Sequence, residues 1–199
     1  MKKYSEIKDV LAPYSGVIYF MLILAGSHFF WKFTMLGDES DNFVSFFGIN
    51  LSAIFQFGAD HVAEATTAVL NFFGINAQLE PFNVIRHDNG QAVRVVWSCT
   101  GFKQAYIFAC IIGFYKGPFL KKLWYIPAGL VVVYAFNIFR IAMISAITKL
   151  HPDWFYFLHE HLFKYMYYAV IFGMWVYWEE VIVSKQKMKD NHSEINAEQ

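Results

Sequence analysis

Long apolar stretches with few charged side chains constrain this chain more than any other feature. The first, residues 13–31, contains no Asp, Glu, Lys or Arg, and others follow at 101–115, 123–148 and 162–183. A helix of about 20 apolar residues crosses a bilayer, and 57% of the chain is hydrophobic against 16% charged. We therefore predict an all-α, polytopic membrane protein with about four core transmembrane helices, forming a single integral membrane domain over residues 1–183.

The first apolar stretch has the features of both a signal peptide and a membrane anchor, because lysines precede it. No small-x-small cleavage site is visible, since the apolar run continues through Phe29, Phe30 and Trp31. We interpret this stretch as an uncleaved first transmembrane helix.

The region between the first and second stretches has a different pattern. Residues 37–75 combine apolar runs with a polar centre, which favours amphipathic helices on the membrane surface. A pair of short membrane-embedded helices within 43–75 is the alternative. In residues 81–97, β-prone runs flank Asn89-Gly90, a signal for a small β-hairpin. This hairpin is expected outside the hydrocarbon or packed on protein, because lipid does not tolerate an open sheet edge.

Lysines fix the predicted orientation. They precede the first stretch, separate the second from the third and follow the fourth: Lys2, Lys3, Lys8, Lys116, Lys121, Lys122, Lys185, Lys187 and Lys189. With four spans these groups share one side, which is cytoplasmic by the positive-inside rule. Residues 37–98 and 149–160 then lie on the extracytoplasmic side. The polar segment 184–199 is predicted to be a disordered cytoplasmic tail.

Cys99 is the first candidate for a reactive residue, since it lies where polar, strand-like sequence meets the second apolar stretch. If Ser98 caps the following helix, Cys99 falls in its first turn, where the helix macrodipole is positive. Lys103, four residues on, adds a cation on the same face. Both effects favour the thiolate, which is the nucleophilic form of cysteine. The alternative is a small, inert residue at a helix start.

Arg140 lies within the third apolar stretch, where a central arginine costs about 2.5–3.5 kcal/mol on insertion scales. Its guanidinium supplies fixed positive charge and forked donors, so beside a thiol it could lower the thiol pKa or hold an oxyanion. Snorkelling to the interface or a structural ion pair is the alternative. Asn137 lies on the same helix face and could orient Arg140 or a substrate amide, or form an interhelical hydrogen bond.

Histidines open the fourth apolar stretch. His159 and His161 are both placed to act as the acid or base that a cysteine nucleophile needs, and the spacing alone does not choose between them. With Glu160 they also suggest a metal site. Residues two apart do not share a helix face, however, and the zinc protease motif needs a spacing of four. We therefore predict no metal.

The net charge and the number of cysteines narrow the possible functions. The formal net charge is zero, so nothing points to a nucleic-acid partner, and we expect no cofactor. Two cysteines are too few for a disulfide framework. The second, Cys110, is expected to be a small buried residue, as free cysteines usually are.

Taken in order, these motifs resemble the exosortase/archaeosortase family. The chain has Cys-Thr-Gly at a helix start, Asn-x-x-Arg in the next span and a histidine opening the last, over roughly residues 92–180. The resemblance implies a polytopic membrane cysteine transpeptidase. The cysteine of the family falls on Cys99, its arginine on Arg140 and its histidine most naturally on His159, and we assign supporting or substrate-binding roles to Asn137, Lys103 and His161.

The implied reaction is cleavage of a C-terminal sorting signal, which consists of a short motif, a transmembrane helix and a basic tail, from exported proteins. It would take place at the outer face of the inner (cytoplasmic) membrane, through a thioester that passes to a lipid, a glycan or water. One alternative is a non-enzymatic transporter subunit or assembly factor, in which Arg140 and Asn137 line a path or join helices. Another is a metal-dependent hydrolase that uses His159, Glu160 and His161.

Overall fold

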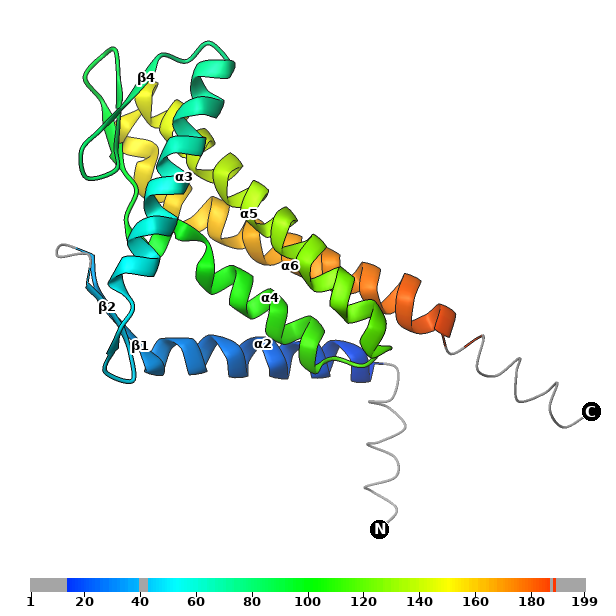
Figure 1. Cartoon of the computed structure of the whole chain (residues 1–199). Helices are drawn as coiled ribbons and strands as arrows, with labels where there is room; N and C mark the ends of the chain where they lie inside the picture. Colours follow the sequence, from blue (N-terminus) through cyan, green and yellow to red (C-terminus); the bar gives the residue numbers. More distant parts are fainter. Residues whose placement is uncertain (1–13, 40–42, 187, 189–199) are drawn as a thin grey trace, which may run out of the picture.

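Helices make up most of the computed structural model, which describes residues 14–39, 43–186 and 188 (Figure 1). Each predicted apolar stretch is helical, and one further helix precedes the second stretch. The helices are α2 (Ser15–Thr34), α3 (Ser52–Phe72), α4 (Phe102–Phe114), α5 (Phe119–Leu150) and α6 (Phe163–Tyr177).

Among the described residues, α2 and α5 are long and apolar enough to cross a membrane. The apolar helix α4 is shorter, with 13 residues. The 15 residues of α6 lie between two π-helical turns, η4 (Phe157–Leu162) and η5 (Trp178–Val183). Length and composition therefore support α2 and α5 as spans, and membrane crossing by α4 and α6 stays a prediction.

The chain is mostly helical, as predicted, but it also forms two small antiparallel sheets, of which the first was not predicted. The first lies in 35–50, a region that includes part of the segment predicted as amphipathic helices, and it consists of β1 (Met35–Asp38), β2 (Phe43–Phe46) and β3 (Ile49–Asn50). The turn between β2 and β3 explains the difference. Phe47 and Gly48 both have positive φ, at 48° and 83°, which is the conformation of a two-residue hairpin turn. The remainder of the segment is the single helix α3.

The second sheet lies at the far end of the molecule from the start of α2 and the end of α6 (Figure 1). It contains β4 (Ala77–Glu80), β5 (Val84–His87) and β6 (Ala92–Arg94), and β5 pairs with β6 in the segment for which we predict a hairpin. The turn after β5 is fixed to the end of α5 by polar contacts. His87 Nε2 lies 2.8 Å from Ser145 Oγ, and Asn89 Nδ2 donates to the Lys149 carbonyl at 2.6 Å.

One apolar core joins α2, α4, α5 and α6 at the end of the bundle that carries Lys116, Lys121 and Lys122, which we call the lysine-rich end. Phe108 and Trp178 are fully buried there, and a Cβ at Gly129 would lie only 2.1 Å from Phe108 Cζ. Lys122 Nζ donates to the Tyr115 carbonyl at 2.6 Å. The start of α2, the α4–α5 connection and the end of α6 therefore lie at the same end of the bundle, as Figure 1 shows. Residues 184–186 continue the last helix, and the other residues of the predicted tail, apart from 188, lie outside the described ones.

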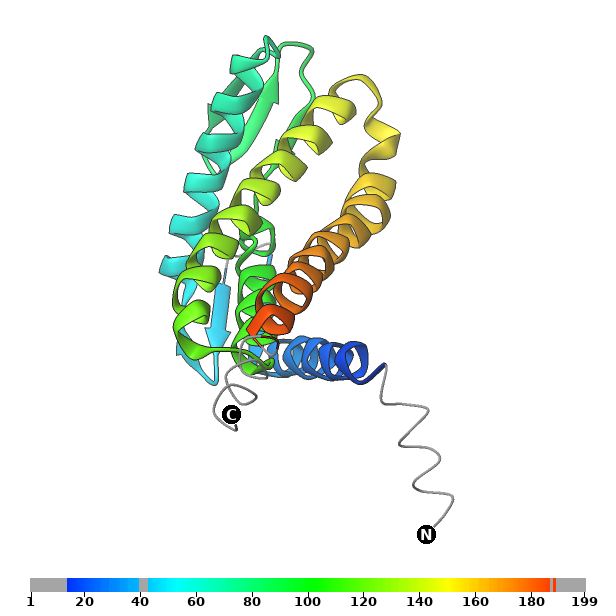
Figure 2. The ribbon, with the colours of Figure 1, turned by 90° about the vertical axis from the view of Figure 1, so that its right-hand side faces the viewer.

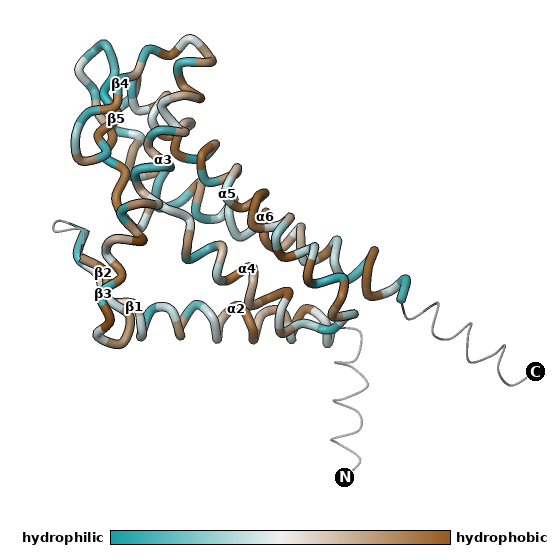
Figure 3. Tube along the Cα trace, viewed as in Figure 1, coloured by the Kyte–Doolittle hydropathy of each residue, from teal (hydrophilic) through white to brown (hydrophobic). Residues whose placement is uncertain are grey.

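A second apolar core joins α3, α5 and the second sheet. Ala63 and Ile85 are fully buried in it, and Ile141 contributes from α5. One side of α3 is thus packed on protein, and its placement on a membrane surface stays a prediction. By contrast, only 11% of the apolar window of α2 is buried, so most of its hydrophobic surface (brown in Figure 3) is available to lipid.

Candidate active site

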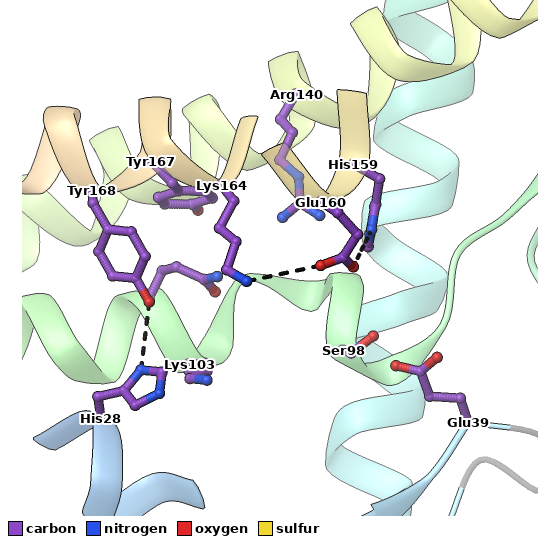
Figure 4. A pocket seen from close by; sticks show the side chains of 11 residues that line it. His28, Glu39, Ser98, Lys103, Arg140, His159, Glu160, Lys164, Tyr167 and Tyr168 are labelled. Carbon is purple, nitrogen blue, oxygen red and sulfur yellow. Dashed lines mark hydrogen bonds and ion pairs between the residues drawn. The ribbon is translucent and has the colours of Figure 1, made fainter. Parts of the chain in front are cut away.

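A polar cavity of about 280 Å³ lies where the short 3₁₀ turn η2 (Trp97–Thr100), α4, α5 and α6 meet. Figure 4 shows that its side chains come from segments far apart in the sequence. The lining residues are His28, Glu39, Ser98, Lys103, Gln104, Arg140, His159, Glu160, Lys164, Tyr167 and Tyr168. Arg140, His159 and Lys103 thus come together as the sequence suggests. Cys99 is not itself among the described lining residues, but its neighbour Ser98 is.

Cys99 lies in a short 3₁₀ turn, η2 (Trp97–Thr100), before α4 begins. Our prediction that Ser98 caps α4 is wrong, because Gly101, with φ at 80°, separates the turn from the helix. Only glycine adopts such a conformation without strain. Thr100 Oγ1 donates to the Trp97 carbonyl at 2.8 Å and stabilises the turn. Cys99 therefore precedes α4, and Lys103 does not share a helical face with it.

Asn137 of α5 holds this turn in place. It is fully buried, and its Nδ2 donates to the Cys99 carbonyl at 2.8 Å. Gly101 packs against the same amide, since a Cβ there would lie 3.0 Å from Asn137 Cγ. Of the alternatives for Asn137, the structure thus has the hydrogen bond between helical segments, and that bond positions the candidate nucleophile.

Arg140 lies one turn after Asn137 on α5 and is only 7% exposed. Its Nε is buried and makes no hydrogen bond to any described residue, and its guanidinium points toward His159 and Glu160 (Figure 4). The side chain therefore faces the cavity, which disagrees with the alternative that it snorkels to the membrane surface. Its charge lies close enough to influence both Cys99 and His159.

His159 lies in the π-helical turn η4, and its imidazole is close enough to the Cys99 thiol to act on it as a hydrogen-bonding partner. Its Nδ1 lies 3.1 Å from Glu160 Oε1, and its ring stacks on Phe155 with centroids 5.6 Å apart. The turn itself is held to α5 because Leu158 packs against Ile144. One helix, α5, thus positions all three groups.

The electrostatics favour a charged pair. Burial opposes ionisation of the thiol, but the hydrogen bond to His159 and the positive charge of Arg140 outweigh it, so the pKa of Cys99 is lowered. The same hydrogen bond raises the pKa of His159, against the effects of burial and of Arg140. Both shifts favour a thiolate beside an imidazolium, as in an activated cysteine nucleophile.

The chain matches the family described as transmembrane exosortase over residues 43–178. It belongs to the transmembrane exosortase family. Curated proteins and solved structures gave no significant match. The matched region of this exosortase contains Cys99, Arg140 and His159. It begins at residue 43, whereas the motifs of the sequence extend over roughly residues 92–180. The family match therefore also includes α3 and most of the first sheet.

His161 is separated from this site. It is exposed and contacts the rings of Tyr156 and Phe157, and it does not line the cavity of the exosortase. Among the described residues, moreover, no group of three His, Cys, Asp or Glu side chains is placed to hold a metal ion.

Several cavity residues of the exosortase were not predicted. Glu160 was considered only as a metal ligand, yet it orients His159 and lies 3.8 Å from Lys164 Nζ. The spacing of Glu160 and Lys164, four residues in a helix, is a sequence signal for that pair. His28 and Glu39 reach the cavity from α2 and from the end of β1. Such tertiary contacts cannot be predicted from a local sequence pattern.

Proposed function

We propose that this exosortase is a cysteine transpeptidase that cleaves the C-terminal sorting signal of exported proteins. One observation carries the proposal: the Cys99 thiol lies close enough to His159 for the two to shift each other's pKa, and the buried Arg140 acts on both. A nucleophile, an acid–base group and a fixed cation are the parts that acyl transfer requires.

In the first step, the Cys99 thiolate attacks the carbonyl carbon of the scissile peptide bond. A C–S bond forms, and the carbonyl π electrons move to oxygen. The guanidinium of Arg140 has an unpaired buried Nε, and it stabilises the resulting oxyanion. Preorganised donors of this kind act strongly in a water-excluded site.

In the second step, the tetrahedral intermediate collapses and the C–N bond breaks. The His159 imidazolium donates its proton to the departing amine, which leaves a thioester on Cys99 and a neutral imidazole. Because Nδ1 faces Glu160, Nε2 is the ring nitrogen available for this transfer. The raised pKa of His159 favours the protonated form that the step consumes.

The thioester then passes to an acceptor. A lipid or glycan nucleophile, or water, attacks the thioester carbonyl, His159 removes its proton, and the C–S bond breaks to restore the Cys99 thiolate and the imidazolium. The substrate is an exported protein with a short motif, a transmembrane helix and a basic tail at its C-terminus. We place the reaction on the extracytoplasmic side of the inner membrane, opposite the lysine-rich end.

Two single cysteine variants test this function. Full-length protein in liposomes is incubated with a tagged sorting-signal substrate, and product and thioester are measured. Cys99→Ala is expected to abolish both, whereas Cys110→Ala is expected to behave like wild type, because Cys110 lies within α4 and outside the cavity. Processing by Cys99→Ala at the wild-type rate would eliminate the proposal and would favour the transporter or assembly-factor interpretation.

A further inference from the structure

A second cavity adjoins the candidate active site. It has a volume of about 220 Å³ and is lined by Met21, Leu24, Ala25, His28 and Tyr168. The residues from α2 are spaced three, one and three apart, so they form one stripe along that helix. His28 and Tyr168 also line the polar cavity, and the hydroxyl of Tyr168 lies 3.5 Å from His28 Nδ1. We call this second cavity the α2–α6 groove.

The groove lies between two helices that diverge. Near the lysine-rich end α2 and α6 touch, since the Phe20 ring lies 4.7 Å from Trp175 and 5.4 Å from Phe172 between centroids. Figures 1 and 2 both show the helices separating toward the candidate active site. The groove is therefore closed at one end and leads into the polar cavity at the other.

We expect the groove to face lipid, because its α2 wall belongs to a helix whose apolar side chains are largely exposed. Met21 is 54% exposed, and Ala25 is exposed beside it. Next to Ala25, a Cβ built at Gly26 would meet nothing within 4 Å. Small residues on a membrane helix allow another helix to approach closely. The hollow of about 220 Å³ is too small for a whole helix, but its apolar wall and the small residues beside it fit side chains from one face of a helix that packs against α2 from the bilayer.

We propose that the α2–α6 groove binds the transmembrane helix of the substrate and delivers the polar segment at its outer end to Cys99. This inference rests on the proposed function and specifies where its substrate docks. A ligand that fills both cavities must be apolar beside Met21 and polar beyond His28 and Tyr168. A membrane helix followed by a polar peptide has that chemistry. A lipid with its polar headgroup has that chemistry as well, and adducts to lipid alone in the crosslinking experiment are the outcome that would favour it.

Photo-crosslinking tests the position directly. A photoreactive phenylalanine analogue replaces Met21 in the Cys99→Ala variant, which retains uncleaved substrate. The matched control carries the analogue at Val131, which is 67% exposed on α5. We expect a crosslink to the tagged substrate from position 21 and none above background from position 131. Lipid adducts alone at position 21, or equal substrate crosslinks at both positions, would overturn the proposal.

Filling the groove provides a second test that does not depend on crosslinking. Ala25→Trp is expected to raise KM for the helix-bearing substrate about tenfold, equivalent to about 1.4 kcal/mol, with kcat retained. Cleavage of a short peptide without the helix is expected to be unchanged, as is every parameter of Val131→Trp. An equal loss on both substrates, or no loss on either, would contradict docking in the groove. Neither result would bear on Cys99, whose role is tested separately by Cys99→Ala.

Discussion

The two halves of α5 differ in what they bury. Toward the lysine-rich end, Tyr125 and Val133 enter an apolar core that also holds Trp178. Toward the other end the same helix buries Asn137 and Arg140. The first half packs through close contacts between apolar side chains, and Gly129 allows Phe108 to approach the helix.

The second half would be costly if its polar groups had no partners, because each unsatisfied group in lipid costs free energy. Asn137 is bonded to the Cys99 turn, and Ser145 to His87. Arg140 keeps an unbonded buried Nε. Both halves contribute buried apolar side chains, including Ile141 and Ile144 in the second, but the buried polar groups of the candidate site belong to the second half alone. Substitutions of those polar groups and of the apolar core should therefore have different effects.

The largest expected effect distinguishes two histidines at the polar end. His159→Asn removes the group bonded to Cys99 and should reduce processing about 10²- to 10⁴-fold, the range for acid–base catalysis. His161→Asn should leave the rate near wild type, because His161 is exposed and outside the cavity. Rates are measured with the tagged substrate in liposomes. Equal losses in the two variants would break the assignment of His159.

Removing the buried positive charge of Arg140 is expected to have the next largest effect on the rate. Arg140→Gln should lower kcat about 10²- to 10³-fold, as the loss of one oxyanion donor does. It should leave thermal stability nearly intact, because the Nε of Arg140 makes no hydrogen bond to a described residue. Arg140→Lys keeps the charge but lacks the forked donors, so it should restore only part of the rate.

The pH dependence of Cys99 alkylation tests whether the charge of Arg140 lowers the pKa of the thiol. The lowered pKa of Cys99 means that the thiolate persists to lower pH than in an ordinary thiol, and labelling slows only as the pH falls through that value. Loss of the Arg140 charge raises the pKa, so the midpoint in Arg140→Gln should move to higher pH. An unchanged midpoint would show that Arg140 does not act on the thiol.

The smallest effect concerns the packed half. Gly129→Ala places a methyl group 2.1 Å from buried Phe108, and such overpacking costs about 1–3 kcal/mol. Gly173→Ala is the control, since a Cβ there meets nothing within 4 Å. Unfolding in detergent should show a loss for Gly129→Ala alone, with processing per folded molecule unchanged. If Gly129→Ala abolished processing in a stable protein, the two halves would not be separable.

The apolar stretches predicted α2 and α5 to within a few residues, because the length and lack of charge needed to cross lipid are visible locally. The first sheet was missed because its strands are short. Phe43–Phe46 has too few residues to show an alternating pattern, and the turn depends on a positive φ at Phe47, a residue type that rarely adopts it.

The candidate site was partly predictable for a similar reason. Cys99 and Arg140 stand out because each is unusual in its own segment. The cap at Ser98 could not be predicted correctly, since α4 begins after Gly101, which adopts a left-handed conformation. The choice of His159 over His161 depends on the π-helical turn η4 and on Leu158 packing against Ile144, which no local spacing reports.

The lowered pKa of Cys99 depends on Arg140 of α5 and His159 of η4, and these three segments are synthesised at different times. Cys99 emerges from the ribosome before Arg140, and His159 follows both. Until the last segment is inserted, the thiol lacks the hydrogen bond that contributes to its lowered pKa. Over the 60 residues from Cys99 to His159 the growing chain therefore carries a thiol without this partner, and we expect the lowered pKa only when the bundle is nearly complete.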